Sequence, residues 1–113
     1  MSTDCLFCRI VRGDIPATVV ASDEHCVAFR DVSPQAPVHV LVVPREHVSS
    51  LDAVTDPQVL GRVMTMAAAI ARLEGIVDAG YRTVINTNAN GGQTVFHLHA
   101  HVLGGRRMTW PPG

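Results

Sequence analysis

The chain has 113 residues, of which 47% are hydrophobic and 17% are charged, and its formal net charge is −1 at pH 7. This size and composition predict one folded domain and exclude a disordered tail, and the near-neutral charge argues against a nucleic-acid partner. No apolar run reaches the roughly 20 residues of a membrane span, and residues 1–4 carry no signal stretch, so we expect a cytoplasmic protein without membrane contact.

The N-terminal third predicts a short helix followed by a hairpin. Leu6, Phe7, Ile10 and Val11 recur at helical spacing, which predicts a helix from Asp4 to Val11. Two runs of β-branched or apolar residues, 18–21 and 26–30, flank a polar stretch and therefore predict two paired strands. The segment 33–37 contains two prolines and predicts a rigid loop. Residues 38–43 then predict a buried strand that ends at Pro44.

The C-terminal half predicts one long helix and two further strands. Thr55 and Gln58 have the spacing of a capping box, with Thr55 as the N-cap of a helix that ends before Gly75. The apolar face of this helix is formed by Leu60, Val63, Met64, Ala67, Ile70 and Ala71, and Met66, Ala68 and Ala69 widen it, as either a thick core or a dimer contact would require. Residues 81–87 and 95–103 predict strands joined by a turn, so the fold class is α+β.

Three histidines near the C-terminus carry the strongest chemical signal. His97, His99 and His101 alternate with Leu98 and Ala100, so on a strand the three imidazoles line one face, about 6.8 Å apart. Metal ligation and nucleophilic catalysis both use such a row, because imidazole binds zinc and titrates near neutrality. The preceding turn, residues 91–94, offers N–H groups and a hydroxyl to a phosphate and favours catalysis. Lysine chemistry is excluded, because all nine basic residues are Arg.

The cysteines suggest a metal site more than a disulfide. Cys5 and Cys8 have the Cys-x-x-Cys spacing of zinc ligands, although one such pair is only half of a site. Two buried apolar thiols would look the same in sequence. Cys26 has no nearby partner, and we expect it in the core.

The segment from His97 to Leu103 fits the His-φ-His-φ-His-φ-φ signature and resembles the histidine triad (HIT) superfamily. Residues 31–39, 91–93, 104–106 and the terminal Trp-Pro-Pro-Gly resemble its Hint branch. The resemblance implies a single domain over residues 1–113 with a HIT-like fold: an antiparallel sheet of about five strands, one long and one short helix, and a sheet continued across a homodimer.

The resemblance also implies an activity, the hydrolysis of purine nucleoside 5′-phosphoramidates such as adenosine 5′-monophosphoramidate. His99 would be the nucleophile that forms a nucleotidyl-histidine, His101 and His39 would orient it and share its proton load, and His97 would shape the phosphate site. Two alternatives stay open: a nucleotide-binding or zinc-stabilised interaction module with incidental hydrolysis, and a dinucleoside polyphosphate hydrolase. The terminal Trp-Pro-Pro-Gly argues against the second alternative.

The remaining site residues follow from the same resemblance. Asn86, the backbone of Gly92 and Gln93, and Thr94 would contact the phosphate or the leaving group, and many Hint proteins have Ser where this chain has Thr94. Asp31 would bind the ribose hydroxyls. The walls around the base would be Leu6, Phe7, Ile10, Phe29 and Val32, and Trp110 would lie near the active site of the partner subunit. Catalysis would need no cofactor, and a structural zinc would be held by Cys5, Cys8, His47 and His97.

Overall fold

The computed structural model describes residues 5–113. Three α-helices and one 3-10 helix accompany five strands in this part of the chain. The strands are β1 (Val19–Ser22), β2 (Cys26–Arg30), β3 (Val38–Pro44), β4 (Tyr81–Val84) and β5 (Ala100–Gly104). The helices are α1 (Leu6–Val11), η1 (Leu51–Ala53), α2 (Pro57–Leu73) and α3 (Asn88–Gly91). Within these residues no helix combines the length and apolar character needed to cross a membrane.

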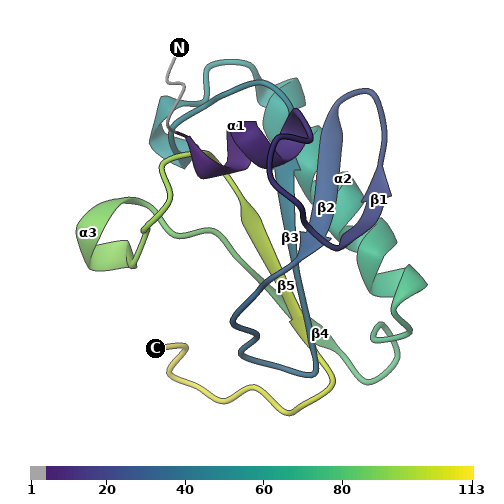
Figure 1. Cartoon of the computed structure of the whole chain (residues 1–113). Coiled ribbons are helices and arrows are strands. Elements are labelled where there is room, and N and C mark those ends of the chain that lie inside the picture. The colour runs from purple at the N-terminus through teal and green to yellow at the C-terminus, as the bar shows by residue number, and fades with distance from the viewer. Residues whose placement is uncertain (1–4) are drawn as a thin grey trace.

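The five strands form one antiparallel sheet in the order β1-β2-β3-β5-β4 (Figure 1). This confirms the expected fold class. β5 is inserted between β3 and β4, so the strand that carries His101 lies in the interior of the sheet, and β1 and β4 form its edges.

The two faces of the sheet are covered by different helices (Figure 1). On β3, Val40 and Val42 pack in the core that contains the buried residues of α2, whereas Leu41 and Val43 pack with Phe7 of α1. This alternation follows from the two-residue period of a strand, and it explains why residues 40–43 of β3 are all apolar: they are buried on both sides.

The long helix agrees with the prediction except at its start. Its N-cap is Asp56, whose carboxylate accepts the N–H of Gln58 at 2.9 Å, so the prediction of Thr55 as the N-cap is wrong. Pro57 then occupies the first helical position, where its missing N–H costs nothing. The residues of α2 that are buried are Val63, Ala67, Ile70 and Ala71.

The last two strands are shorter than predicted. β4 ends at Val84, and β5 begins at Ala100, so residues 95–99 are not part of the sheet. This segment is held instead by the loop that follows β3: the N–H of Leu98 donates to the Val48 carbonyl at 2.6 Å. The predicted turn at residues 88–92 is the single-turn helix α3, which ends at Gly92 with a φ of 87°, a conformation that favours glycine. The predicted start of α1 at Asp4 lies outside the described residues.

Candidate active site

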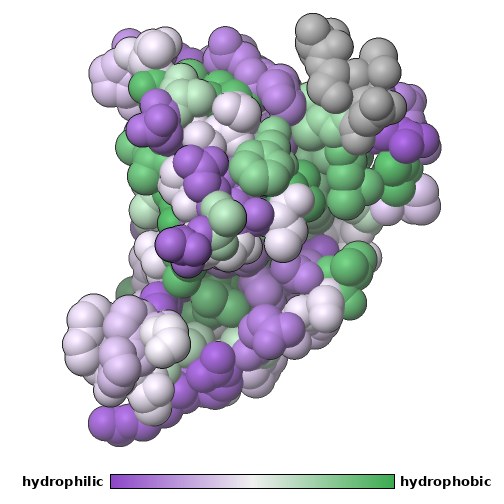
Figure 2. All heavy atoms as spheres, turned by 90° about the vertical axis from the view of Figure 1, so that its left-hand side faces the viewer, coloured by the Kyte–Doolittle hydropathy of each residue, from purple (hydrophilic) through white to green (hydrophobic). Residues whose placement is uncertain are grey.

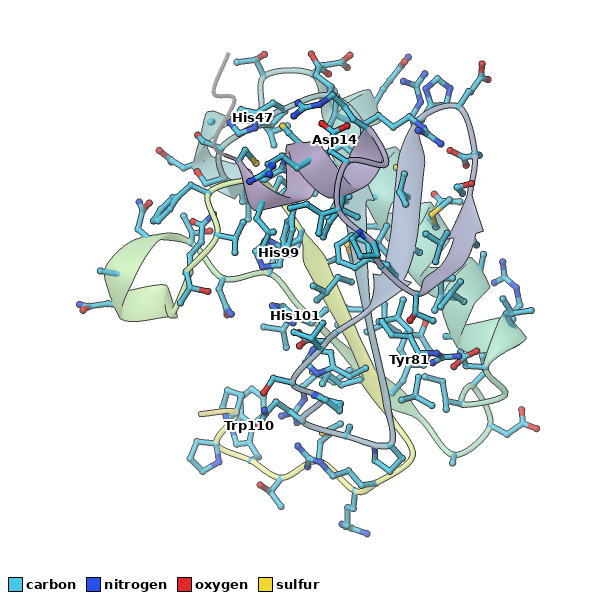
Figure 3. The ribbon with its side chains drawn as sticks, viewed as in Figure 1. Asp14, His47, Tyr81, His99, His101 and Trp110 are labelled. Carbon is cyan, nitrogen blue, oxygen red and sulfur yellow. The ribbon has the colours of Figure 1, made fainter. Side chains whose placement is uncertain are left out.

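Of the three clustered histidines only His101 lies on a strand, and His99 lies nearer to α1 than His101 does (Figure 3). Leu98 and Ala100 are fully buried in the core under α2, so the side chains alternate as predicted even where no sheet forms. On the opposite face, the ring of Phe7 meets the ring of His99 edge to face, with the centroids 5.0 Å apart. The helix α1 therefore covers His99 on this face.

His99 is held so that one ring nitrogen is free. Its Nδ1 lies 2.7 Å from the carbonyl oxygen of His97, and because a carbonyl only accepts, Nδ1 carries the proton. The Nε2 atom then holds the lone pair. Burial lowers the pKa of His99, which favours the neutral ring at pH 7. A neutral imidazole with an exposed lone pair is the form that can act as a nucleophile.

His39 and His101 form a second hydrogen-bonded unit. The main-chain N–H of Gln35 donates to His39 Nδ1 at 3.0 Å, so the proton of His39 is on Nε2. This Nε2 lies 2.9 Å from His101 Nδ1 and 3.4 Å from a carboxylate oxygen of Asp31. Since His101 Nδ1 accepts, its own proton is on Nε2. That Nε2 is buried and has no hydrogen-bond partner among residues 5–113, which leaves a donor for a bound molecule.

Acid should destabilise the protein through His101. Burial, with smaller contributions from His99 and His39, lowers the pKa of His101 to about 4. Because this pKa lies below the ordinary value, the unfolded chain binds the proton more readily, so the contribution to stability is present above about pH 6.5 and is lost as the pH falls toward 4. We expect His101 to account for about 1–2 kcal/mol of lost unfolding free energy between pH 7 and pH 5. Urea unfolding of wild type and His101→Gln at both pH values measures this difference, and equal losses in the two proteins would contradict it.

A cavity of about 270 Å³ opens beside His99 and His101. Its walls come from α1, β2, β3 and the segment before β5 (Figure 3). It is lined by these residues of the predicted site: Leu6, Phe7, Ile10, Phe29, Asp31, Val32, Thr94, His99 and His101. Five further residues line it and were missed: Pro16, Ala17, Arg30, Leu41 and Val95. Leu41 is two residues after His39 on β3, so strand alternation could have placed it on this face. The cavity thus combines apolar walls with one carboxylate, one guanidinium, one hydroxyl and two imidazoles.

The glycine turn differs from the prediction. The N–H of Gly92 donates to the Ala89 carbonyl and that of Gln93 to the Asn88 carbonyl, both at 3.0 Å, so these amides close α3 and do not face a phosphate. The Gln93 side chain is buried and bonds to the main chain at Asn88, Ser49 and Val95. In this turn it is Thr94 that lines the cavity.

Two predicted contacts lie outside the cavity lining. Asn86 is half-buried in the segment after β4. Trp110 is 81% exposed; the Arg82 guanidinium lies 6.0 Å from its ring centroid and donates to the Thr109 carbonyl at 3.0 Å. Arg82 therefore fastens the tail to β4, the edge of the sheet.

Cys5, Cys8, His47 and His97 converge at the N-terminus of α1. Their ligand atoms lie within 4.8 Å of one another, with Cys8 Sγ 3.2 Å from His47 Nδ1 and Cys5 Sγ 3.4 Å from His97 Nδ1. A tetrahedral zinc with typical bond lengths separates sulfur and nitrogen ligands by about 3.5 Å. His97 Nε2 is 2.8 Å from the Pro44 carbonyl, which places the proton there and leaves the Nδ1 lone pair toward the thiols. The four residues therefore fit a metal ion.

The position of His97 corrects its predicted role at the phosphate. Its ring points to the cysteines and not into the cavity, and only its main-chain carbonyl, through His99 Nδ1, touches the candidate nucleophile. His97 therefore belongs both to the cluster with Cys5, Cys8 and His47 and to the row of three histidines.

Comparison with known proteins places this arrangement in a family. The profile of the HIT domain matches residues 12–108. A purine nucleoside phosphoramidase from Escherichia coli K12 is 46% identical over 96% of this chain and 92% of its own length. The crystal structure of a HIT family hydrolase from Legionella pneumophila superposes with a TM-score of 0.94 at 49% identity, covering 97% of this chain and all of the other. A zinc-bound histidine triad family protein from Mycobacterium smegmatis gives a TM-score of 0.84 at 33% identity, over the whole of this chain and 82% of that one.

Proposed function

This chain belongs to the HIT domain family, and on that premise we propose that it hydrolyses purine nucleoside 5′-phosphoramidates. The observation that carries the proposal is the pair of ring nitrogens at the cavity: a free lone pair on His99 Nε2 and an unpartnered N–H on His101 Nε2. A phosphoramidate needs both, because phosphorus must be attacked and the departing nitrogen must receive a hydrogen bond.

The proposed reaction has two steps. His99 Nε2 attacks the phosphorus and the P–N bond breaks as the departing nitrogen takes the proton of His101 Nε2–H, which leaves the nucleotide on His99. Water then attacks the phosphorus and the bond to His99 breaks, which restores the ring. Overall the hydroxyl of one water ends on phosphorus and its proton replaces the one that leaves with the amine. Thr94 would contact the phosphate, since its side chain carries a hydroxyl and it lines the cavity.

We propose that the apolar part of the cavity takes the purine. Phe7 and Phe29 pack edge to face, 5.4 Å between centroids, and form its aromatic wall with Leu6, Ile10 and Val32 nearby. Val32 is fully exposed, so it can close on a base without unpacking the core. The Asp31 carboxylate, at the rim, would accept the ribose hydroxyls.

We propose that the Cys/His group holds a structural zinc. In support, the four side chains converge within one small cluster, and the donor set of two sulfurs and two nitrogens is one that zinc prefers. A zinc there would cross-link α1 to the segments that hold His47 and His97. It would supply no catalytic chemistry, because none of the four ligand atoms belongs to the histidines of the cavity.

We propose, further, a homodimer in which the sheet continues through β4. This strand has a neighbour on one side only, and Tyr81 at its start is partly exposed. The exposed Trp110 is fastened to the same edge by Arg82, so it would lie beside the partner subunit. This placement fits the expectation that Trp110 serves the other active site.

The substrate class is tested by offering two nucleotides to the purified full chain. We expect release of AMP from adenosine 5′-monophosphoramidate with a kcat/KM at least about 100-fold above that for diadenosine tetraphosphate. Chromatographic quantification of AMP over time measures both rates. The reverse preference would favour a dinucleoside polyphosphate hydrolase, and AMP binding without turnover of either compound would leave a binding module.

A further inference from the structure

Arg106 joins the segment after β5 to the loop between β2 and β3. Its Nε donates to the main-chain carbonyl of Gln35 at 2.9 Å, across 71 positions of sequence, and its side chain is exposed. The preceding Gly105 has a φ of +88°, and a Cβ built on it would lie only 2.9 Å from Pro37 Cβ. Arg106 therefore holds Gln35 by a hydrogen bond, and Gly105 holds Pro37 by close packing.

The loop that Arg106 holds determines where the proton of His39 lies. Gln35 is held through both of its neighbouring peptide groups: its carbonyl, in the peptide to Ala36, accepts from Arg106, and its N–H, in the peptide from Pro34, donates to His39 Nδ1 at 3.0 Å. As long as this N–H is present, His39 cannot carry a proton on Nδ1 in its neutral form and must carry it on Nε2. His101 must then accept at Nδ1 and present its Nε2–H to the cavity.

We propose that Arg106 is a positioning residue for the reaction: by holding the Gln35 carbonyl it keeps the adjoining Gln35 N–H on His39, and it thereby selects the ring tautomers of His39 and His101 that turn an N–H toward the substrate. The inference rests on the proposed function for its kinetic consequence, but the tautomers themselves are a property of the free protein. Arg106 is absent from the cavity lining, so it does not act by touching the substrate.

Other groups around His39 and His101 are held in place by bonds that do not involve Arg106. The Asp31 N–H donates to the His39 carbonyl at 3.0 Å, and the Asp31 carboxylate accepts the Ser33 N–H at 2.8 Å. The carboxylate faces His39 Nε2, and the ring of His99 faces His101. Removing the Arg106 side chain should therefore leave the carboxylate near the ribose site and change the proton positions of the pair.

The decisive measurement is the ¹⁵N chemical shift of the His39 and His101 ring nitrogens at pH 7, which distinguishes protonated from unprotonated nitrogen. In wild type we expect the proton of each ring on Nε2. In Arg106→Ala we expect a substantial share of His39 with its proton on Nδ1, and in Arg106→Lys, whose ammonium can also donate to the Gln35 carbonyl, a return toward wild type. Arg107→Ala is the matched control, because its side chain makes no hydrogen bond within residues 5–113.

We expect kcat to change together with the tautomers of the His39 and His101 rings. We expect Arg106→Ala to lower kcat on adenosine 5′-monophosphoramidate about tenfold with KM within about twofold, which is the size of one lost charge-assisted hydrogen bond. Gln35→Pro, which deletes the N–H itself, should lower kcat at least as much. Wild-type nitrogen shifts in Arg106→Ala, or an equal loss of kcat in Arg107→Ala, would overturn the proposal. A wild type that leaves phosphoramidates intact while its shifts respond to Arg106→Ala would overturn the proposed function and leave the positioning role standing.

Discussion

Replacing His99 by alanine should reduce kcat on adenosine 5′-monophosphoramidate by at least about 10³-fold, because the variant lacks the lone pair that attacks phosphorus. Two Nε2 atoms belong to histidines that line the cavity. That of His99 has a free lone pair, whereas that of His101 carries a proton. No neighbouring imidazole can therefore take over the attack without first changing its tautomer.

We expect His99→Ala to form no covalent intermediate and still to bind AMP. Rapid acid quench followed by mass spectrometry should detect a nucleotide mass on the wild-type chain and none on His99→Ala. Affinity for AMP should change little, since the apolar walls and Asp31 are untouched. His25→Ala is the control, because His25 lies in the turn between β1 and β2, where it pairs with Glu24. A variant with normal turnover, or an adduct that persists without His99, would contradict the proposed mechanism.

Loss of the metal ligands should produce the largest change in stability. Cys8 is buried, and its Sγ lies within 3.5 Å of both His47 Nδ1 and His97 Nδ1, so Cys8→Ser removes a sulfur that contacts both histidines. We expect the bound zinc to fall from about one ion per chain to none and the unfolding free energy to drop by about 3 kcal/mol, which is about 10 °C in Tm. Elemental analysis and thermal unfolding measure the two quantities.

Cys26→Ala separates this effect from the loss of any buried thiol. Cys26 packs in the core under α2 and belongs to no Cys/His group in the described chain, so the variant should keep its zinc and lose the smaller free energy of a trimmed core residue. Chelation should lower the Tm of wild type and Cys26→Ala alike and leave that of Cys8→Ser unchanged. Purified wild type without zinc, or with a Tm that a chelator does not move, would contradict the metal proposal.

The parts of the fold that could be predicted are those set by residue patterns along one segment. The hairpin and the strand from Val38 follow from runs of apolar and β-branched residues, and the long helix follows from its period-3.6 apolar face. The structure contains all three. The misplaced boundaries depend on distant contacts. Residues 95–99 have the composition of a strand, but the Val48 carbonyl takes the N–H of Leu98, and no sequence pattern near either residue indicates that bond.

The same division applies to the candidate site. The residue types of the cavity could be predicted because the motif fixes them and the alternation of 97–101 survives outside the sheet. The direction of each ring could not. His97 turns to the cysteines because Pro44 accepts its Nε2–H, and the amides of Gly92 and Gln93 turn inward because α3 needs them at its end. Hydrogen bonds to main-chain groups set these directions. Every residue carries the same main-chain groups, so the composition of the sequence does not indicate which of them will bond.

The insertion of β5 between β3 and β4 has a consequence for the assembly of the protein during synthesis. The ribosome releases β1, β2, β3 and β4 before the strand that must separate β3 from β4, so the central gap can be filled only when residue 104 has emerged. Until then His39 does not have the ring of His101 to pair with. Turnover by a nascent or truncated chain would thus report the final step of folding, and a shorter fragment should be inert however much secondary structure it has gained.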